Sequence, residues 1–282
     1  MLKSAILFIT WQCQNWCPYC WQRQAQKNGE FTPEPFLPVD RWVEALNRLD
    51  IETLDISGGE PTMQPDFFRM LERLNARRIA MTSNLVGDLT EFVQRISPEK
   101  VFSITASLHP TGKMTNDVFT GKILLLKARG FNVTVNFVTY PEQMYMLPHY
   151  RAHFERLGFR FHVDPYAQTK FFPYSFTQEE RDFLRPYIAQ DRETFFMKKP
   201  EAKEDALMLC SGGRTHLNIQ PNGDAYRCIF DKVEGLAKVG NIFDPAFEPY
   251  ATDRPCSDWW RCSGCDRDKV TLTRPSLEVI AP

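Results

Sequence analysis

The chain has 282 residues, of which 43% are hydrophobic and 24% charged, a size that suits one large α/β domain with a small appendage. Its formal net charge of -1 gives no support to binding of nucleic acid or of an anionic membrane surface. The apolar run near the N-terminus is too short to span a membrane and lacks a small-residue cleavage site, which predicts a cytoplasmic protein.

An alternation of apolar runs and helical patterns occupies residues 5–163. Strands are expected over residues 5–10, 53–57, 78–82, 101–108, 133–138 and 160–163. Helices are expected over residues 40–49, 66–75, 89–96, 117–129 and 148–157. This alternation is typical of βαβ units on a parallel sheet, and right-handed crossovers curl six such units into an open, partial (β/α)6 barrel of the TIM type.

Functional residues of such folds lie at the carboxyl ends of the strands. Several polar or thiol-bearing segments follow the predicted strands and are expected at this one edge. They are the loop 13–20, Gly58 to Glu60, Ser83 and Asn84, Ser107 with His109, and Asn136.

The eight cysteines are unevenly distributed. Three lie in the first 20 residues, none between 21 and 209, and five between 210 and 265. In a reducing compartment such clusters indicate metal binding or catalysis rather than disulfides. The distribution therefore predicts two separate metal centres.

The first centre is the loop in which Cys13, Cys17 and Cys20 are spaced CxxxCxxC. Thiolates bind soft metals and iron–sulfur clusters, and a [4Fe–4S] cluster has four irons to ligate. Three cysteines leave one iron without a protein ligand. The alternatives are zinc and buried thiols, but three ligands leave a structural zinc site unfilled.

Three features occur together: CxxxCxxC after the first strand, Tyr19 before the third cysteine, and Gly58-Gly59-Glu60-Pro61 after the second strand. In this combination the chain resembles the radical S-adenosylmethionine enzymes. The resemblance covers about the first 165 residues. It implies that Cys13, Cys17 and Cys20 bind a [4Fe–4S] cluster whose open iron is chelated by S-adenosylmethionine. It also implies reductive cleavage of that cosubstrate to a 5′-deoxyadenosyl radical, which abstracts a hydrogen from the substrate. A reducing partner such as flavodoxin or ferredoxin is then expected.

The same resemblance implies further contacts to S-adenosylmethionine. The Tyr19 backbone is expected to meet adenine, and Ser107 and Asn136 the ribose or carboxylate. Gly58, Gly59 and Glu60 are expected at the methionine amino group, because glycines allow close backbone approach and a carboxylate suits an ammonium group. For this last segment alone, a plain strand-to-helix turn is the alternative.

His109 stands in Ser107-Leu108-His109-Pro110, where many relatives have Ser-Leu-Asp-Gly. Two roles remain open for it. It is either a proton acceptor on the substrate side or a histidine hydrogen-bonded at the edge of the sheet.

The C-terminal part begins after a helix that Thr177 and Glu180 open with a capping box. We expect a barrel domain over residues 1–190, a linker over 191–209 and a small cluster-binding subdomain over 210–282. Residues 216–220 and 224–230 flank Pro221-Asn222-Gly223 and predict a hairpin.

The C-terminal cysteines form a second pattern: Cys210 is separated by twelve residues from Gly223, which is separated by four residues from Cys228, and the CxxC pair Cys262 and Cys265 follows. This pattern resembles the extension called SPASM or, when shortened, twitch. The resemblance implies an auxiliary [4Fe–4S] cluster closed by four cysteines. Zinc is the alternative, and ligand geometry alone favours it. Cys256 is left over, and it is a small buried hydrophobe, an alternative ligand or a hydrogen-atom donor to a substrate radical.

The fate of the substrate radical separates two enzyme hypotheses. In the first, a small molecule such as a sugar or aminocyclitol alcohol is oxidised, and the auxiliary cluster accepts the second electron. In the second, a ribosomally made peptide is crosslinked or epimerised. The chain starts directly at the first strand, which favours the small molecule. A third hypothesis is a non-catalytic iron–sulfur or zinc protein that acts as a sensor or scaffold.

Overall fold

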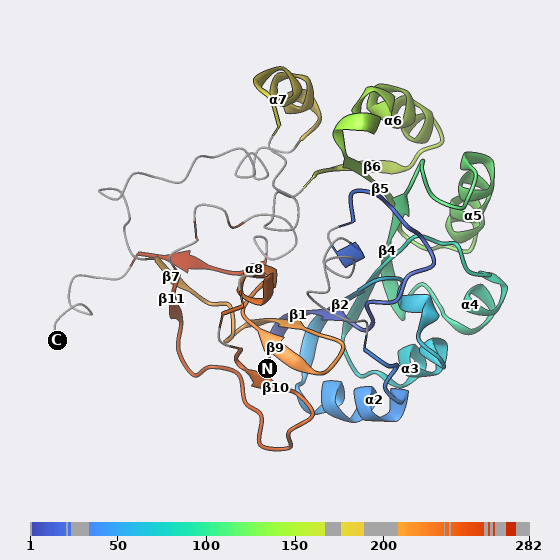
Figure 1. The fold of residues 1–282 in the computed structure, drawn as a ribbon. Coiled ribbons are helices and arrows are strands. Elements are labelled where there is room, and N and C mark those ends of the chain that lie inside the picture. Colours follow the sequence, from blue (N-terminus) through green and yellow to red (C-terminus); the bar gives the residue numbers. More distant parts are fainter. Residues whose placement is uncertain are drawn as a thin grey trace.

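The computed structural model describes residues 2–20, 22–23, 34–166, 176–188, 208–233, 235–236, 238–256, 259, 262 and 269–274. Six parallel strands form the body of its main sheet, as expected (Figure 1). They are β1 (Leu2–Phe8), β2 (Ile51–Ser57), β3 (Arg78–Ser83), β4 (Val101–Leu108), β5 (Val133–Thr139) and β6 (Arg160–Pro165).

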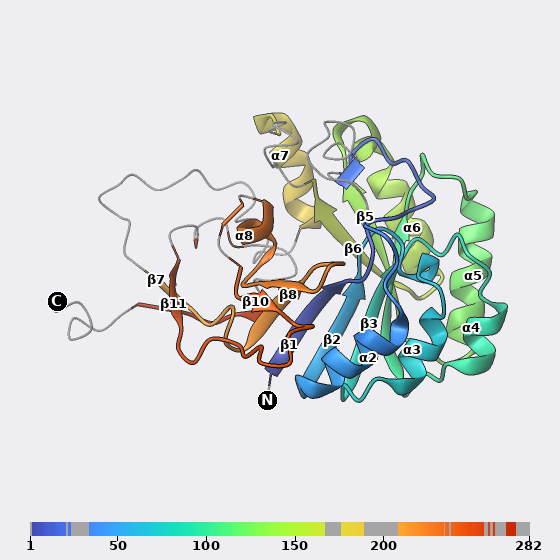
Figure 2. The ribbon, with the colours of Figure 1, turned by 60° about the horizontal axis from the view of Figure 1, so that its bottom comes forward.

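The helices that connect these strands lie along one side of the sheet (Figure 2). They are α2 (Val39–Arg48), α3 (Phe67–Arg73), α4 (Thr90–Arg95), α5 (Asn116–Ala128) and α6 (Leu147–Arg156). The sheet does not close, because β6 stands at one end of its strand order. The mixed α/β fold with an open, partial barrel is therefore confirmed.

Alternating side chains give the sheet an apolar and a polar face. On β2, Leu54 and Ile56 are fully buried in the hydrophobic core, whereas Asp55 between them is only half-buried. Strand register places Asp55 on the same face as Ile6 and Ala80, and it places Asn136 between Ser107 and His162, so this face is mixed on the first strands and polar on the last three. We call the face that holds these residues the inner face.

The C-terminal extension continues the barrel sheet. β8 (His216–Ile219) pairs in parallel with β1, β9 (Asp224–Tyr226) pairs antiparallel with β8, and β10 (Gly240–Asn241) pairs with β9. The expected hairpin is thus present, and its attachment beside β1 gives a nine-stranded sheet (Figure 1). The predicted linker lies almost wholly outside the described residues.

A second, three-stranded sheet has the order β11-β7-β12, in which β7 is Met208–Cys210, β11 is Arg254–Cys256 and β12 is Leu272–Thr273. The extension also contacts α2. The Phe243 ring lies 4.8 Å from that of Trp42, and Arg48 donates a hydrogen bond to the Ile242 carbonyl at 2.6 Å. Lys269 forms an ion pair with Asp55 on the inner face.

Two local details refine the sequence prediction. The capping box of Thr177 and Glu180 is present at the start of α7 (Gln178–Leu184). The expected strand over 224–230 is too long, because β9 ends at Tyr226 and a short helix, α8 (Ile229–Val233), follows. Arg227 forms a bidentate ion pair with Asp231 four residues later, a pairing that stabilises a helical turn.

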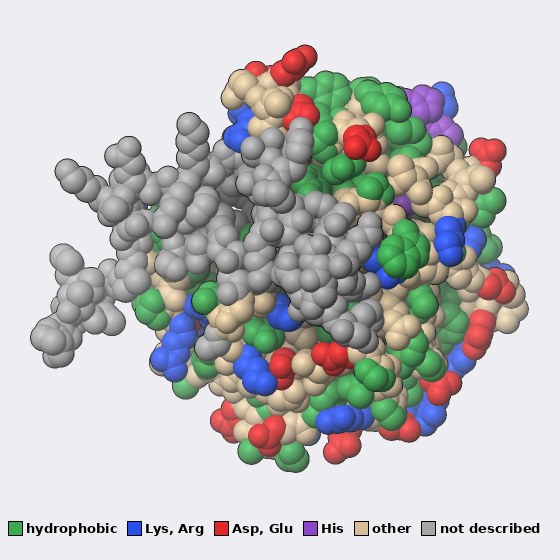
Figure 3. Space-filling model, viewed as in Figure 1, with side chains coloured by type: hydrophobic (Ala, Val, Ile, Leu, Met, Phe, Trp, Pro, Cys, Tyr) green, Lys and Arg blue, Asp and Glu red, His purple; other side chains and the backbone are tan. Residues whose placement is uncertain are grey.

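Acidic and basic side chains are interspersed along the margin of the face shown in Figure 3, which fits the net charge of -1. Within the described residues, the helices include none with the length and apolar character needed to cross a membrane.

Candidate functional site

The cysteine loop follows β1 directly, at the carboxyl edge of the sheet. Cys17 is buried, and Cys13 and Cys20 are half-buried. The Cys20 N–H donates to the Cys17 carbonyl at 3.1 Å, and the Arg23 guanidinium donates to the Cys13 carbonyl. The loop contains no regular helix or strand, so contacts with its neighbours must set the positions of its thiols.

Gly58 and Gly59 provide the closest of these contacts. The Gly59 N–H donates to the Thr10 carbonyl at 2.6 Å, and the next N–H along the chain donates to the Gln12 carbonyl at 2.8 Å. A β-carbon on Gly59 would overlap the Gln12 carbonyl, and one on Gly58 would overlap that of Thr10. Gly58 also has φ +140°, which side chains disfavour. The glycines thus hold the end of β2 against the cysteine loop, a role that the sequence analysis missed.

Glu60 is a fully buried carboxylate at the same junction. Its Oε1 accepts hydrogen bonds from the Thr62 hydroxyl at 2.7 Å, the Thr62 N–H at 3.2 Å and the Ser83 hydroxyl at 2.8 Å. Its Oε2 accepts only the Asn84 N–H, at 2.8 Å. Burial raises the pKa of Glu60, and these donors oppose that shift. The carboxylate ties β2 to β3 and keeps lone-pair capacity on Oε2, so its contact with a cosubstrate ammonium group stays a prediction.

Asn84 links the end of β3 to the thiols. Its Nδ2 donates to the Cys13 sulfur at 3.5 Å, and its Oδ1 accepts from the Gln14 side chain at 3.3 Å. The sequence signal for Asn84 was its place directly after a predicted strand.

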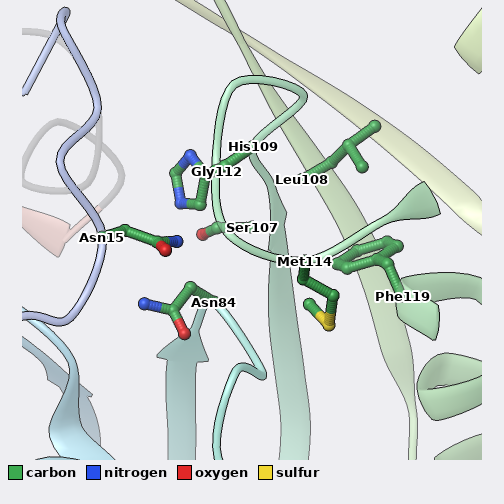
Figure 4. Close-up of a pocket in the computed structure, with 8 residues that line it drawn as sticks. All are labelled: Asn15, Asn84, Ser107, Leu108, His109, Gly112, Met114 and Phe119. Atoms are coloured by element: carbon green, nitrogen blue, oxygen red, sulfur yellow. The ribbon is translucent and has the colours of Figure 1, made fainter.

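A small cavity of about 10 Å³, close to the room one water needs, lies beside these groups. Asn15 from the cysteine loop and Ser107 on β4 turn their polar ends toward each other there, and Asn84 after β3 lies beside them (Figure 4). His109, beyond the end of β4, also lines this cavity.

His109 contacts the cysteine loop itself. Its Nδ1 lies 2.8 Å from the Tyr19 hydroxyl. Burial lowers the pKa of His109 to about 4, so the imidazole is neutral at pH 7. Burial raises the pKa of Tyr19, which keeps the phenol protonated. Tyr19 therefore donates to His109, and this contact supports the role of a hydrogen-bonded histidine at the edge of the sheet; proton transfer from a substrate remains untested.

Asn136 and Ser107 are register partners on β5 and β4, on the inner face. Asn136 is buried, and its Oδ1 has no hydrogen-bond partner. Because burying an unpaired carbonyl oxygen is costly, this atom suits a ligand that brings a donor, such as a ribose hydroxyl. On β6, His162 continues this row, and its Nε2 lies 3.2 Å from Asp164.

The thiols also fit a cluster electrostatically. Burial, followed by the charge of neighbouring Cys20, raises the pKa of Cys17 to about 12. Burial raises the pKa of Cys13 and Cys20 as well. Three adjacent thiolates in this environment are stable only beside a strong positive charge, which an iron–sulfur core supplies. Among the described side chains, no three His, Cys, Asp or Glu converge on a single-ion site. A [4Fe–4S] cluster takes each thiolate on a different iron and needs no such convergence.

The second group of cysteines lies in the extension. Cys210 is buried at the end of β7, and the Gly212 N–H donates to its sulfur at 3.3 Å. Cys228 follows β9, and Cys262 is half-buried. Cys265 lies outside the described residues. A β-carbon on Gly212 would press on the Cys210 sulfur at 3.2 Å, so the glycine leaves room around this thiol.

Comparison with known proteins agrees with this site. Residues 7–145, which include the cysteine loop, Glu60, Ser107 and Asn136, match the family model of the Radical SAM superfamily. This part of the chain belongs to that superfamily, and the protein is a radical S-adenosylmethionine enzyme. The family's cofactors are a [4Fe–4S] cluster and S-adenosylmethionine, and the residues described above fit both.

Particular relatives extend the similarity beyond that domain. Mycofactocin maturase MftC of Mycobacterium ulcerans is 22% identical over 280 residues, covering 88% of this chain and 73% of that protein. The crystal structure of Streptococcus suis SuiB bound to S-adenosylmethionine superposes with a TM-score of 0.62 at 17% identity, covering 86% of this chain and 64% of SuiB. SuiB bound to its precursor peptide SuiA gives a TM-score of 0.61 at 16% identity, covering 94% and 65%. The chain thus spans just under two thirds of SuiB and shares its fold.

Proposed function

We propose that this protein is a maturase that modifies a peptide by radical chemistry, with an auxiliary [4Fe–4S] cluster in its extension. The observation that carries the proposal is the extent of the similarity to MftC, which runs through 88% of the chain rather than through the family domain alone. The shared fold with SuiB in its complex with a precursor peptide supports it. The comparisons therefore favour the peptide over the small molecule that we first expected.

In this proposal Cys13, Cys17 and Cys20 hold the reactive cluster, and S-adenosylmethionine takes its open iron. When bound, this pair supplies the 5′-deoxyadenosyl radical that abstracts a hydrogen atom from the substrate. Asn84 donates to the Cys13 sulfur, and the hydrogen bond from Tyr19 to His109 fixes the loop. Donors directed at a thiolate sulfur stabilise its negative charge and tune the cluster.

The inner face provides the substrate side of this site. Its polar positions lie in three rows across the sheet: Asp55 in one, Thr82 and Thr105 in the next, and Ser107, Asn136 and His162 in the third. Such a face suits a substrate with many hydrogen-bonding groups, as a peptide backbone has. A sugar has them too, so the preference for a peptide rests on the comparisons.

The auxiliary cluster is proposed at the thiols of the extension, including Cys210, Cys228 and Cys262. Backbone and side-chain donors surround this site, since the Gly212 N–H contacts the Cys210 sulfur and Arg227 lies next to Cys228. A site closed by protein thiolates transfers electrons or anchors a substrate but leaves no iron for S-adenosylmethionine.

The test is a paired assay on anaerobically reconstituted protein with dithionite and S-adenosylmethionine. Short peptides encoded beside its gene are added one at a time, and 5′-deoxyadenosine and peptide mass are measured. We expect one peptide to change mass, with loss of two hydrogens or of a small group, and to raise 5′-deoxyadenosine formation.

The control adds aminocyclitols and sugars in place of the peptides. Oxidation of one of these with no peptide modified would overturn the peptide proposal and restore the small-molecule hypothesis. The variant Cys17→Ala controls for cleavage that does not depend on the cluster.

A further inference from the structure

The extension contains five cysteines, whereas a [4Fe–4S] cluster binds four thiolates. Spacing alone assigns Cys210, Cys228, Cys262 and Cys265 and leaves Cys256 without a role. The structure gives independent information on which cysteines are ligands, because Cys256 and Cys210 lie on neighbouring strands.

Strand register places these two thiols on the same face of the small sheet. β7 and β11 are antiparallel, with Arg254 opposite Cys210 and Cys256 opposite Met208. Residues two apart on a strand point to the same face, so Cys256 is the diagonal neighbour of Cys210. Diagonal neighbours are about 7–8 Å apart. A disulfide needs Cα atoms within about 6.8 Å, so this spacing disfavours a disulfide and suits two ligands on different irons of one cluster.

Electrostatics agrees with the register. Burial is the main cause that raises the pKa of Cys210, and the charge of Cys256 raises it further. The charges of Cys256 and Cys228 both raise the pKa of the Arg227 guanidinium. Arg227 also donates to the Pro255 carbonyl at 2.7 Å, which fixes β11 beside the turn that contains Cys228. Cys210, Cys228 and Cys256 therefore all interact electrostatically with Arg227.

We infer that Cys256 is a ligand of the auxiliary cluster, beside Cys210 and Cys228. This inference rests on the auxiliary cluster of the proposed function. The fourth ligand is then one member of the pair Cys262 and Cys265, and the other member is surplus. The fixed β7–β11 pairing presents two of the four thiolates on one rigid sheet.

The test isolates the auxiliary cluster in a protein that carries Cys13→Ala, Cys17→Ala and Cys20→Ala. Iron and sulfide are counted after anaerobic reconstitution, and the reduced protein is examined by electron paramagnetic resonance. We expect about four irons in this background and about three or fewer, with a changed spectrum, after Cys256→Ala. Cys256→Ser should keep more iron and shift the spectrum, because a serine oxygen replaces the thiolate.

Met208→Ala is the matched control, since Met208 lies opposite Cys256 in the same strand pair and carries no ligand. It should keep the full iron content and the spectrum. One of Cys262→Ala and Cys265→Ala should do the same. Unchanged iron and spectrum in Cys256→Ala would overturn the inference. Absence of iron from the background itself would overturn the auxiliary cluster as well, so the two failures are distinguishable without any activity measurement.

Discussion

The two cysteine sites are built in opposite ways. In the N-terminal loop, three thiols lie within eight consecutive residues that form no regular structure. Gly58, Gly59 and Asn84 hold this loop from the ends of two neighbouring strands. In the extension, Cys210 and Cys256 lie on different strands, and strand pairing makes them diagonal neighbours on one face of the small sheet.

The difference fits their proposed roles. A loop presents its thiols from one side and leaves the other side of a cluster open for a cosubstrate. Ligands from several strands enclose a cluster and restrict it to electron transfer or anchoring. Substitutions that alter one site and leave the other intact test this contrast, and we order them by the size of the expected effect.

The largest effect is expected for Cys17→Ala. It removes a ligand of the open cluster, so formation of 5′-deoxyadenosine should fall to background and iron should fall from about eight to about four per chain. The counterpart Cys210→Ala should lose a similar amount of iron but still form 5′-deoxyadenosine. Iron analysis and chromatography of the nucleoside measure both. Equal loss of cleavage in the two variants would contradict the division of roles.

Gly59→Ala tests how the loop is held. The added β-carbon would overlap the Gln12 carbonyl, a backbone atom with no freedom to move aside. We expect a loss of about 3 kcal/mol in the free energy of unfolding and weak cluster loading. Urea unfolding and iron analysis measure the two effects.

Gly121→Ala is the matched control for that variant. Gly121 lies inside α5 with nothing within 4 Å of an added β-carbon. Alanine there should raise stability by about 0.5–1 kcal/mol. If Gly59→Ala behaved like this control, the close approach of β2 to the loop would have no structural importance.

These contacts show where sequence reasoning succeeds and where it stops. The parallel strands follow from alternating patterns, and the cysteine loop and Gly58 to Glu60 follow from short motifs, so both were predicted. The contact of the glycines with the cosubstrate stays a prediction. Their close approach to Thr10 and Gln12 was not predicted, because the identity of a glycine does not reveal which backbone approaches it.

The pairing of strands that are far apart in the chain could not be predicted from the sequence either. β8 is four buried residues, His216–Ile219, that pair with β1. Nothing in so short a strand selects β1 over the other open edge of the sheet, at β6. The contact between Tyr19 and His109 joins residues 90 positions apart, and Cys256 becomes a diagonal neighbour of Cys210 through β-sheet register. Spacing rules describe neighbours along the chain, so they missed these contacts.

Glu60→Gln separates a structural from a ligand-binding carboxylate. Glutamine keeps one acceptor oxygen, but its NH2 group replaces the other. That NH2 group then faces the Ser83 hydroxyl or the Asn84 N–H, which are donors themselves. We expect a loss of about 2 kcal/mol of stability, from one unsatisfied buried donor. Denaturant unfolding measures this loss, and calorimetry measures S-adenosylmethionine binding. Unchanged stability with weaker binding would show that Glu60 acts on the cosubstrate alone.

The smallest effect is a pH dependence of stability that His109 contributes. Its pKa is about 4 when folded and about 6.5 when unfolded, so between these values the unfolded chain binds one more proton. The stabilising contribution is complete above pH 6.5 and is lost as the pH falls toward 4. Lowering the pH from 7 to 5.5 should cost about 1 kcal/mol through this residue. His109→Gln should flatten the profile by that amount, and because the other histidines are common to both proteins, their contributions cancel in the difference. Identical profiles would mean that His109 is as accessible to protons in the folded protein as in the unfolded chain, and that the loop does not depend on a neutral imidazole.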